Sequence, residues 1–207
     1  MSTLSDLRTN IADDINRSDL STQIDKAINR AIRFYRRDRF WFQETSSTFT
    51  TIASQQAYGT ADGIPSDIAE IDHVKIAYQS DWVVELDPVT LQEIQNLNIG
   101  NYTGNPEKYA FYANKFYLWP IPDAAYTVTV FYTKNYSDLS SGSDSNDYTN
   151  YAQELIENRA RWWLNMRIIK DMEAAKGDKE LEIESLNALR AETERYISSG
   201  QITATSW

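Results

Sequence analysis

The sequence predicts an α+β protein. Helices from both ends of the chain are expected to form a helical bundle, and the middle of the chain is expected to form a mostly antiparallel β insertion. Apolar residues recur with a helical period at both ends, residues alternate with a period of two between them, and turn-forming residues separate the segments. The predicted boundaries are 1–45 and 150–197 for the bundle, 46–149 for the insertion and 198–207 for a C-terminal tail. Apolar helix faces must be buried against another element, so the two ends are expected to fold together.

Two helices are expected within residues 1–45. Leu4, Leu7 and Ile11 recur at helical spacing, and Asn16-Arg17-Ser18-Asp19 supplies turn and capping residues before a longer helix. That second helix is strongly amphipathic. Its predicted apolar arc comprises Ile24, Ala27, Ile28, Ala31, Phe34, Tyr35 and Phe42. Its predicted basic face comprises Lys26, Arg30, Arg33 and Arg37.

The period changes to two from about Ser46, which predicts strands. In the segment 68–78, Glu70, Asp72 and Val74 fall on one side of the expected strand. Further strands are expected at 82–86, 108–112, 115–119 and 126–134. Asp87 is predicted to cap a short helix that starts with Pro88 and runs to about residue 97.

Helical periodicity returns after a hydrophilic segment, 137–150, that is rich in Ser, Asp, Asn and Gly. Gly177 is predicted to end the first C-terminal helix, and Asp178 is predicted to cap the next. The apolar face of the first helix comprises Ala152, Leu155, Ile156, Trp162, Trp163 and Met166. The stripe of the second comprises Leu186, Leu189, Thr193 and Tyr196.

Composition limits the class of protein. With 207 residues, of which 42% are hydrophobic, the chain can bury the core of one large domain or of one domain with an insertion. No apolar run of about 18 residues is present, and the N-terminus lacks the basic and apolar regions of a secretory signal, so a soluble, non-exported protein is expected. The absence of cysteine excludes disulfides, thiolate nucleophiles and cysteine-ligated metals, and fits a reducing cytoplasm.

The net charge of −10 opposes tight binding of the whole protein to nucleic acid, whose affinity comes mainly from Lys and Arg on phosphates. The charge is unevenly distributed. Residues 1–45 carry eight Lys/Arg against seven Asp/Glu, whereas residues 46–150 carry four against thirteen. The acidity is therefore concentrated in the predicted insertion.

The sequence offers no catalytic or metal site, and no cofactor is expected. His73, the single histidine, lies in a predicted strand without a nucleophile motif around it. The glycines are scattered rather than grouped into a phosphate loop. Carboxylate pairs occur, but the segment containing Asp144, Asn146 and Asp147 lacks the Gly and Glu that complete a calcium loop.

Two surface features allow several interpretations. The basic helix face can be interpreted in three ways: as a solvated face, as a contact for an acidic partner such as the insertion of a neighbouring copy, or as a nucleic-acid surface. The aromatic residues, 13% of the chain, cover a thin sheet, anchor a protein interface or bind sugar. These alternatives remain open at the level of sequence.

Several runs resemble the head-to-tail adaptor proteins of tailed bacteriophages, in the portal adaptor, connector or gatekeeper-like group. They occur in the family's order and span most of the chain. The runs are Ile15-Asn16-Arg17-Ser18-Asp19-Leu20, the segment from Ala27 to Phe42, Ile64-Pro65-Ser66-Asp67-Ile68-Ala69-Glu70-Ile71-Asp72, Tyr117-Leu118-Trp119-Pro120-Ile121-Pro122-Asp123 and Glu154-Leu155-Ile156-Glu157-Asn158-Arg159-Ala160.

The resemblance implies a non-enzymatic virion protein of the neck or tail, assembled in the host cytoplasm as a dodecameric ring that links the portal to tail tube, nozzle or tail-fibre proteins. Genomic DNA would pass through its channel without sequence-specific binding, and no membrane is involved. The basic face would contact the next subunit. Acidic residues expected to face the channel are Glu70, Asp72, Asp81, Glu85, Asp87 and Glu93. Residues expected to contact the portal are Tyr196, Ile197, Gln201, Ile202 and Trp207.

Three alternatives compete with this interpretation. The first is another phage neck component, such as a head-completion or tail terminator protein. The second is an aromatic-rich carbohydrate- or receptor-binding module. The third is an enzyme, for which no nucleophile, metal or phosphate motif is found in the sequence.

Overall fold

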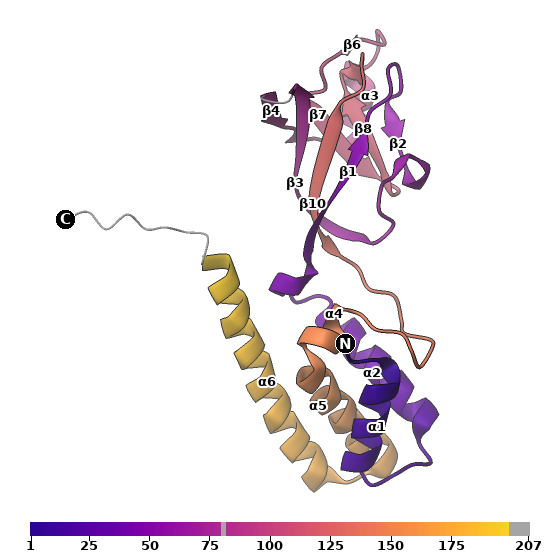
Figure 1. The fold of residues 1–207 in the computed structure, drawn as a ribbon, viewed down its shortest axis with the longest axis vertical. Coiled ribbons are helices and arrows are strands. Elements are labelled where there is room, and N and C mark those ends of the chain that lie inside the picture. Colours follow the sequence, from indigo (N-terminus) through magenta and orange to yellow (C-terminus); the bar gives the residue numbers. More distant parts are fainter. Residues whose placement is uncertain (80–81, 199–207) are drawn as a thin grey trace, which may run out of the picture. The chain divides into compact units, whose positions relative to one another are not determined.

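The structure of the protein, a computed structural model, describes residues 1–79 and 82–198 and shows an α+β fold with two compact units (Figure 1). The helical unit comprises Met1–Gln43 together with the chain from Tyr136 onward, and the β unit comprises Glu44–Asn135. Within the described ranges, no helix is both long and apolar enough to cross a membrane. The two ends of the chain therefore fold into one helical unit.

The helical unit is built from five α-helices and two short segments of other helix types within the described residues. Thr3 starts the first helix with a capping box, in which its side chain accepts from the Asp6 N–H and Asp6 accepts from the Thr3 N–H. The elements are α1 (Leu4–Asp14), α2 (Ser21–Tyr35), the 3-10 helix η1 (Trp41–Gln43), α4 (Asp147–Tyr151), α5 (Gln153–Leu164), the π-helix η3 (Asn165–Ile169) and α6 (Met172–Ser198).

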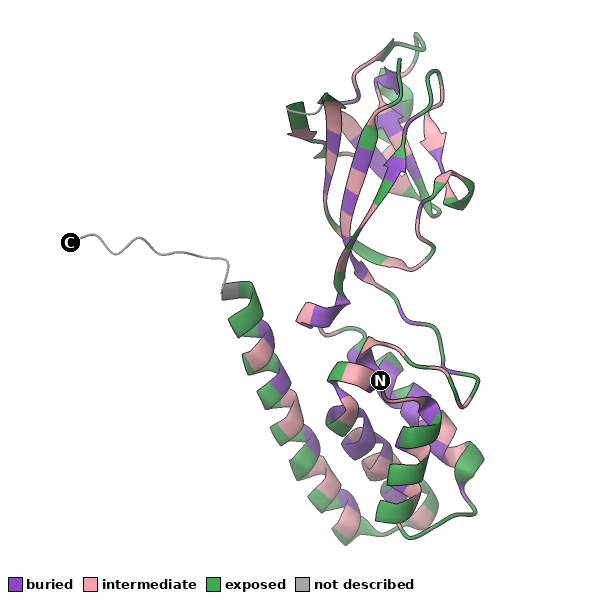
Figure 2. Cartoon of the chain, in the orientation of Figure 1, coloured by how far each residue is buried: buried purple, intermediate pink, exposed green. Residues whose placement is uncertain are grey.

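The core of this unit confirms the predicted apolar faces of the N-terminal helices except at Phe34, which is 49% exposed. Leu4, Leu7 and Ile11 of α1 are fully buried and cluster with residues from α2, α5 and α6, from α4 and η1, and from the connecting segments (Figure 2). Burial of one such Leu or Ile contributes about 1.5–3 kcal/mol. The core members from α2, α5 and α6 are Ile24, Ala27, Ile28, Ala31, Ile32, Tyr35, Leu155, Ile156, Ala160, Leu164 and Leu189.

The predicted break at Gly177 is wrong. The break comes earlier, where the π-helix ends at Lys170 in the left-handed conformation (φ 64°) and Asp171 caps α6 by accepting from the N–H groups of Glu173 and Ala174. Gly177 lies inside α6, where glycine costs only about 1 kcal/mol relative to alanine. The tertiary contacts of Asp178 with Arg161 and Asn165 hold this turn in the helix.

The hydrophilic segment 136–149, expected in the insertion, packs on the helices. Tyr136 and Leu139 are buried in the helical core. The side-chain amide of Asn29 donates to the Leu139 carbonyl at 2.9 Å and accepts from its N–H at 2.8 Å. Asp144 accepts from the N–H groups of Ser140 and Ser141 with one carboxylate oxygen. The β unit consequently ends at Asn135, because the polar segment buries its few apolar residues on the helical side.

The β unit consists of two four-stranded sheets that enclose a core, with an additional two-stranded pair. The first sheet has the order β1-β10-β3-β4, and all its neighbours are antiparallel. Its strands are β1 (Glu44–Thr50), β10 (Thr127–Lys134), β3 (Ile68–Gln79) and β4 (Trp82–Glu85). The second sheet has the order β2-β8-β7-β5. Its strands are β2 (Ala57–Tyr58), β8 (Lys115–Trp119), β7 (Lys108–Tyr112) and β5 (Asp87–Pro88).

The remaining elements of the β unit connect these strands. They are the 3-10 helix η2 (Thr60–Asp62), α3 (Leu91–Leu97), and the parallel pair of β6 (Thr103–Gly104) and β9 (Ile121–Pro122). Core residues come from both large sheets and from adjoining loops, and they form a cluster separate from that of the helical unit. They are Phe49, Tyr58, Ile64, Val74, Ile76, Leu86, Tyr109, Phe116, Leu118, Val128, Val130 and Tyr132.

The helix predicted to begin at Asp87 is wrong in its first turn. Asp87 and Pro88 form β5, which pairs in parallel with Lys108 and Tyr109 of β7. The helix starts at Leu91, where the Thr90 hydroxyl accepts from the Glu93 N–H. Pro88 fits an edge strand because it has no N–H to contribute to a ladder. Pairing with β7 therefore overrides the local Asp-Pro signal.

Candidate assembly surfaces

The first candidate surface is the outward side of α2. Lys26, Arg30 and Arg33 are exposed because the Ile and Ala residues between them turn toward the core. Arg37, predicted to lie on the same helix face, lies beyond the end of α2 at Tyr35 and is also exposed. Arg33 forms an ion pair with Asp138 at 3.7 Å, in which both side chains are about half exposed. Three of the four predicted basic residues thus share one helix face.

Aromatic residues adjoin this basic side chain row. Phe34, predicted in the apolar arc, is 49% exposed, and the guanidinium of Arg159 from α5 lies 3.9 Å from its ring centroid. The same guanidinium lies 4.4 Å from the Trp162 ring, and Arg30 lies 5.5 Å from the Trp163 ring. Cations over aromatic faces are stabilised by the ring quadrupole. We call this surface, formed by Lys26, Arg30, Arg33, Phe34 and Arg37, the α2 surface.

A buried ionic cluster connects α2, which carries the α2 surface, to the helices packed behind it. Glu182 of α6 is 1% exposed and accepts from Arg159 at 3.0 Å, from Lys179 at 2.9 Å and from the hydroxyl of Tyr35. Burial and the adjacent carboxylate raise the pKa of Tyr35 well above its ordinary value. The cluster joins α2, α5 and α6, so it holds the helices that present the α2 surface in one arrangement.

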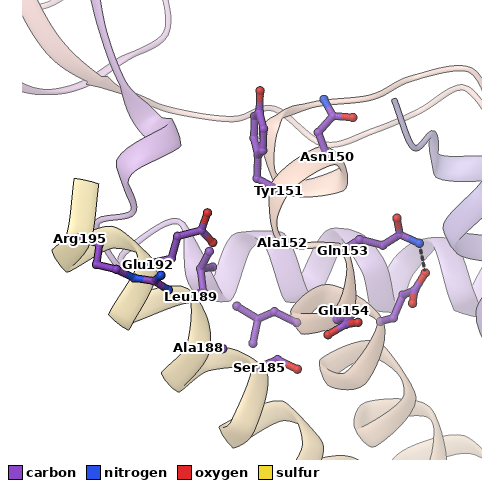
Figure 3. Close-up of a pocket in the computed structure, with 12 residues that line it drawn as sticks. Asn150, Tyr151, Ala152, Gln153, Glu154, Ser185, Ala188, Leu189, Glu192 and Arg195 are labelled. Carbon is purple, nitrogen blue, oxygen red and sulfur yellow. Dashed lines mark hydrogen bonds between the residues drawn. The ribbon is translucent and has the colours of Figure 1, made fainter. Parts of the chain in front are cut away.

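The second candidate surface is an open groove between α5 and α6 (Figure 3). Its walls carry Glu154 and Gln153 from α5 and Ser185, Ala188 and Glu192 from α6. The groove continues past Arg161 and Leu181 toward Asp14 at the end of α1. We call it the α5–α6 groove.

The groove is lined in part by residues outside the apolar stripe that the sequence predicted for the last helix. Leu181 is 47% exposed and falls outside the buried stripe of α6 formed by Glu182, Leu189 and Thr193 (Figure 2). Glu154 and Glu184 are exposed on the two helices that border the groove. An apolar residue off the buried helix face was the only signal in the sequence for this surface, and its acidic neighbours looked like an ordinary solvated face.

In the β unit, the prediction that Glu70 lies on the same side of the strand as Val74 is wrong. The register between β10 and β3 shifts between Phe131, paired with His73, and Tyr132, paired with Ile71, so that Asp72 is an extra residue in β3. After the shift, Ile71 joins Val74 on the core side and Glu70 turns to the other side. Both carboxylates are exposed.

The other predicted acidic residues lie at several places in the β unit. Glu85 on β4 is opposite Lys75 of β3, and Asp87 on β5 is opposite Lys108 of β7. Glu93 on α3 forms an ion pair with Lys108 at 3.8 Å. Glu85, Asp87 and Glu93 are all exposed, and Asp81 lies outside the described residues.

Among the predicted portal contacts, the structure describes Tyr196 and Ile197 near the end of α6. Both are more than half exposed. The Tyr196 ring stacks on Trp41, with centroids 4.2 Å apart and planes 10° apart. Gln201, Ile202 and Trp207 lie outside the described residues.

The side chains with catalytic potential have structural contacts. His73 stacks on Phe131 at 4.2 Å between ring centroids. Asp144 serves the 140–144 loop described above, and over residues 1–79 and 82–198 no group of three His, Asp or Glu side chains could hold a metal ion. In the described residues, the candidate functional features are accordingly the charged and aromatic surfaces.

The described chain is thus an α+β protein with a helical unit formed from both chain ends, a β insertion and exposed charged surfaces. The model of the SU10 adaptor protein family matches residues 2–204. The chain belongs to this family of phage head-to-tail adaptor proteins. No match was found among curated proteins.

Proposed function

We propose that this phage adaptor protein is the repeating subunit of a dodecameric ring that joins the portal to the tail and continues the DNA channel of the virion. The observation that carries the proposal is the presence, within one helical unit, of two unlike surfaces: the α2 surface and the α5–α6 groove. A closed ring needs a heterologous interface, in which one face of a subunit meets a different face of the next. Family membership supports assembly with portal and tail proteins.

The acidic β unit supports a role in DNA passage. Phosphate is bound by Lys and Arg and is repelled by carboxylates, so an acidic wall lets DNA slide without capture. The residues proposed to face the channel are Glu70, Asp72, Asp81, Glu85, Asp87 and Glu93. In this proposal, genomic DNA passes without sequence-specific binding.

The proposed portal contact is at the C-terminal end of the chain. Tyr and Ile side chains exposed near the end of α6 suit burial against a partner, since aromatic residues are enriched at interface hot spots. The contact residues proposed are Tyr196, Ile197, Gln201, Ile202 and Trp207. Tail tube, nozzle or tail-fibre proteins would bind the opposite side of the ring.

The experiment is to mix the purified protein with the portal of the same phage and to image the product by electron cryo-microscopy. The expected result is a twelvefold ring of this protein on the portal, with the C-terminal segment at the contact. A chain shortened after residue 198 is expected to lose portal binding while keeping its helical circular dichroism. Failure of the full chain to bind portal, or binding as a single copy, would overturn the proposal.

A further inference from the structure

The α5–α6 groove and the α2 surface lie on different flanks of α5. Glu154, Glu157 and Arg161 of α5 line the groove, whereas Arg159 and Trp162 contact Phe34 or the ionic cluster on the α2 side. Residues three and four apart share a helix face, so these two sets of α5 residues point to different sides. One helical unit therefore presents both surfaces at once without one blocking the other.

The groove is acidic where a partner could reach it. Glu154 and Glu184 are exposed and Glu192 is partly exposed along its walls. The groove also carries two arginines: Arg161, which is held by Asp178 at 3.2 Å and by Asp14, and Arg195, which is exposed on the α6 wall. The lining glutamates are Glu154, Glu157, Glu184 and Glu192, so carboxylates outnumber these two cations.

The groove also offers apolar contact. Leu181 is 47% exposed and Tyr151 is 52% exposed at its rim, and Ala188 leaves space on the α6 wall. A matching partner would be a helix that combines Lys and Arg with an exposed aromatic ring. The α2 surface has this composition, with Phe34 beside Arg30 and Arg33.

We propose that the α5–α6 groove receives the α2 surface of a second copy of the chain. The inference rests on the proposed ring and specifies its subunit contact: Arg30, Arg33 and Arg37 approach Glu154, Glu184 and Glu192 of the neighbour, and Phe34 contacts the apolar rim. The α2 surface and the α5–α6 groove are different surfaces, so each copy can bind one neighbour through each of them. The contact therefore repeats head to tail until the ring closes. Charge complementarity fixes the register and disfavours like surfaces meeting.

The chain lacks cysteine, so introduced cysteines can report this contact without background. In portal-bound rings of an Arg33→Cys, Ala188→Cys variant, a short bismaleimide should produce a ladder of covalent dimers, trimers and larger species on a denaturing gel. The matched control is Arg33→Cys with Asn187→Cys, since Asn187 is exposed on α6 but is not among the groove residues. No ladder is expected from the control. Equal ladders, or no ladder from rings seen by microscopy, would overturn the inference.

Charge reversal tests the same contact by a different measurement. Arg30→Glu with Arg33→Glu should abolish rings on the portal, as should Glu184→Lys with Glu192→Lys. All four changes in one chain should restore them, because the reversed surfaces are again complementary. Circular dichroism of each variant checks that the helices are intact. Rings that form regardless of these changes would refute the groove contact alone, whereas a parent protein that forms no ring would refute the proposed function.

Discussion

The buried carboxylate of Glu182 makes the stability of the helical unit depend on the side chains that pair with it. It is almost fully buried, yet it is compensated by two cations and the hydroxyl of Tyr35. A buried charge with good partners adds little net stability, but removal of one partner leaves a charge that water cannot reach. The dependence should therefore be strongest on Arg159, whose own side chain is only 16% exposed.

Arg159→Ala is predicted to lower the free energy of unfolding by about 3 kcal/mol, the lower end for breaking a buried pair because Lys179 remains. Urea denaturation followed by circular dichroism measures the change. Arg167→Ala is the matched control, since Arg167 is exposed just after α5, and it should change stability by about 0.5 kcal/mol or less. Equal effects of the two substitutions would contradict the structural role of the cluster.

Tyr132 predicts a dependence of the β unit on alkaline pH. Its ring is 5% exposed, and burial together with the nearby Asp67 raises its pKa to about 12 from an ordinary 10.0. The folded state thus keeps this proton at pH values where the unfolded chain releases it. The resulting stability is full below pH 10 and is lost as pH rises through 12.

Tyr132→Phe is accordingly predicted to weaken the fall in unfolding free energy between pH 9 and pH 11. Urea midpoints of parent and variant at the two pH values measure this difference. Tyr112→Phe, at an exposed position of β7, is the control and should follow the parent. A fall as steep in the Tyr132 variant as in the parent would argue against the assigned cause.

At the scale of elements, the sequence predicted where the helices and strands lie better than where they begin. The helical period of α1 and α2 and the alternation in β3, β8 and β10 correspond to observed elements. The starts of α3 and α6 were wrong, because Asp87-Pro88 and Gly177-Asp178 resemble helix ends locally. Pairing of β5 with β7 and the Arg161–Asp178 ion pair outweigh those local preferences.

The corrected start of α6 makes a testable prediction. Asp171→Ala removes the side chain that accepts from Glu173 and Ala174, and should cost about 1 kcal/mol of helical-unit stability. Asp171→Asn should keep most of that stability, because asparagine also caps helices well. Thermal unfolding of the two variants measures the difference. An unchanged stability of Asp171→Ala would indicate that the cap contributes little.

In the molecule as a whole, the chain enters and leaves the β unit through neighbouring strands. Glu44 at the start of β1 pairs with Thr133 near the end of β10, so both connections to the helical unit start from the same end of an antiparallel ladder. Its core is separate from the helical core. An inserted domain with adjacent ends and its own core has what it needs to fold alone.

Residues 44–135 expressed by themselves are therefore predicted to fold. A single cooperative unfolding transition and dispersed amide resonances would be expected by denaturation and NMR spectroscopy. The matched control is the same fragment with Val74→Asp, which buries a charge in the core at a residue that is 0% exposed. An unfolded parent fragment would show that the β unit depends on the helical unit.

Residue order was sufficient to predict the α+β class, the helical character of both ends, the exposed basic residues of α2 and the family resemblance. These properties depend on periodicity and composition, which local residue order contains. Three features became visible only in the folded chain: the bulge at Asp72, the inclusion of 136–149 in the helical unit and the α5–α6 groove. Each of these arises where residues from distant segments meet, so the energy that selects them is absent from any single stretch of chain.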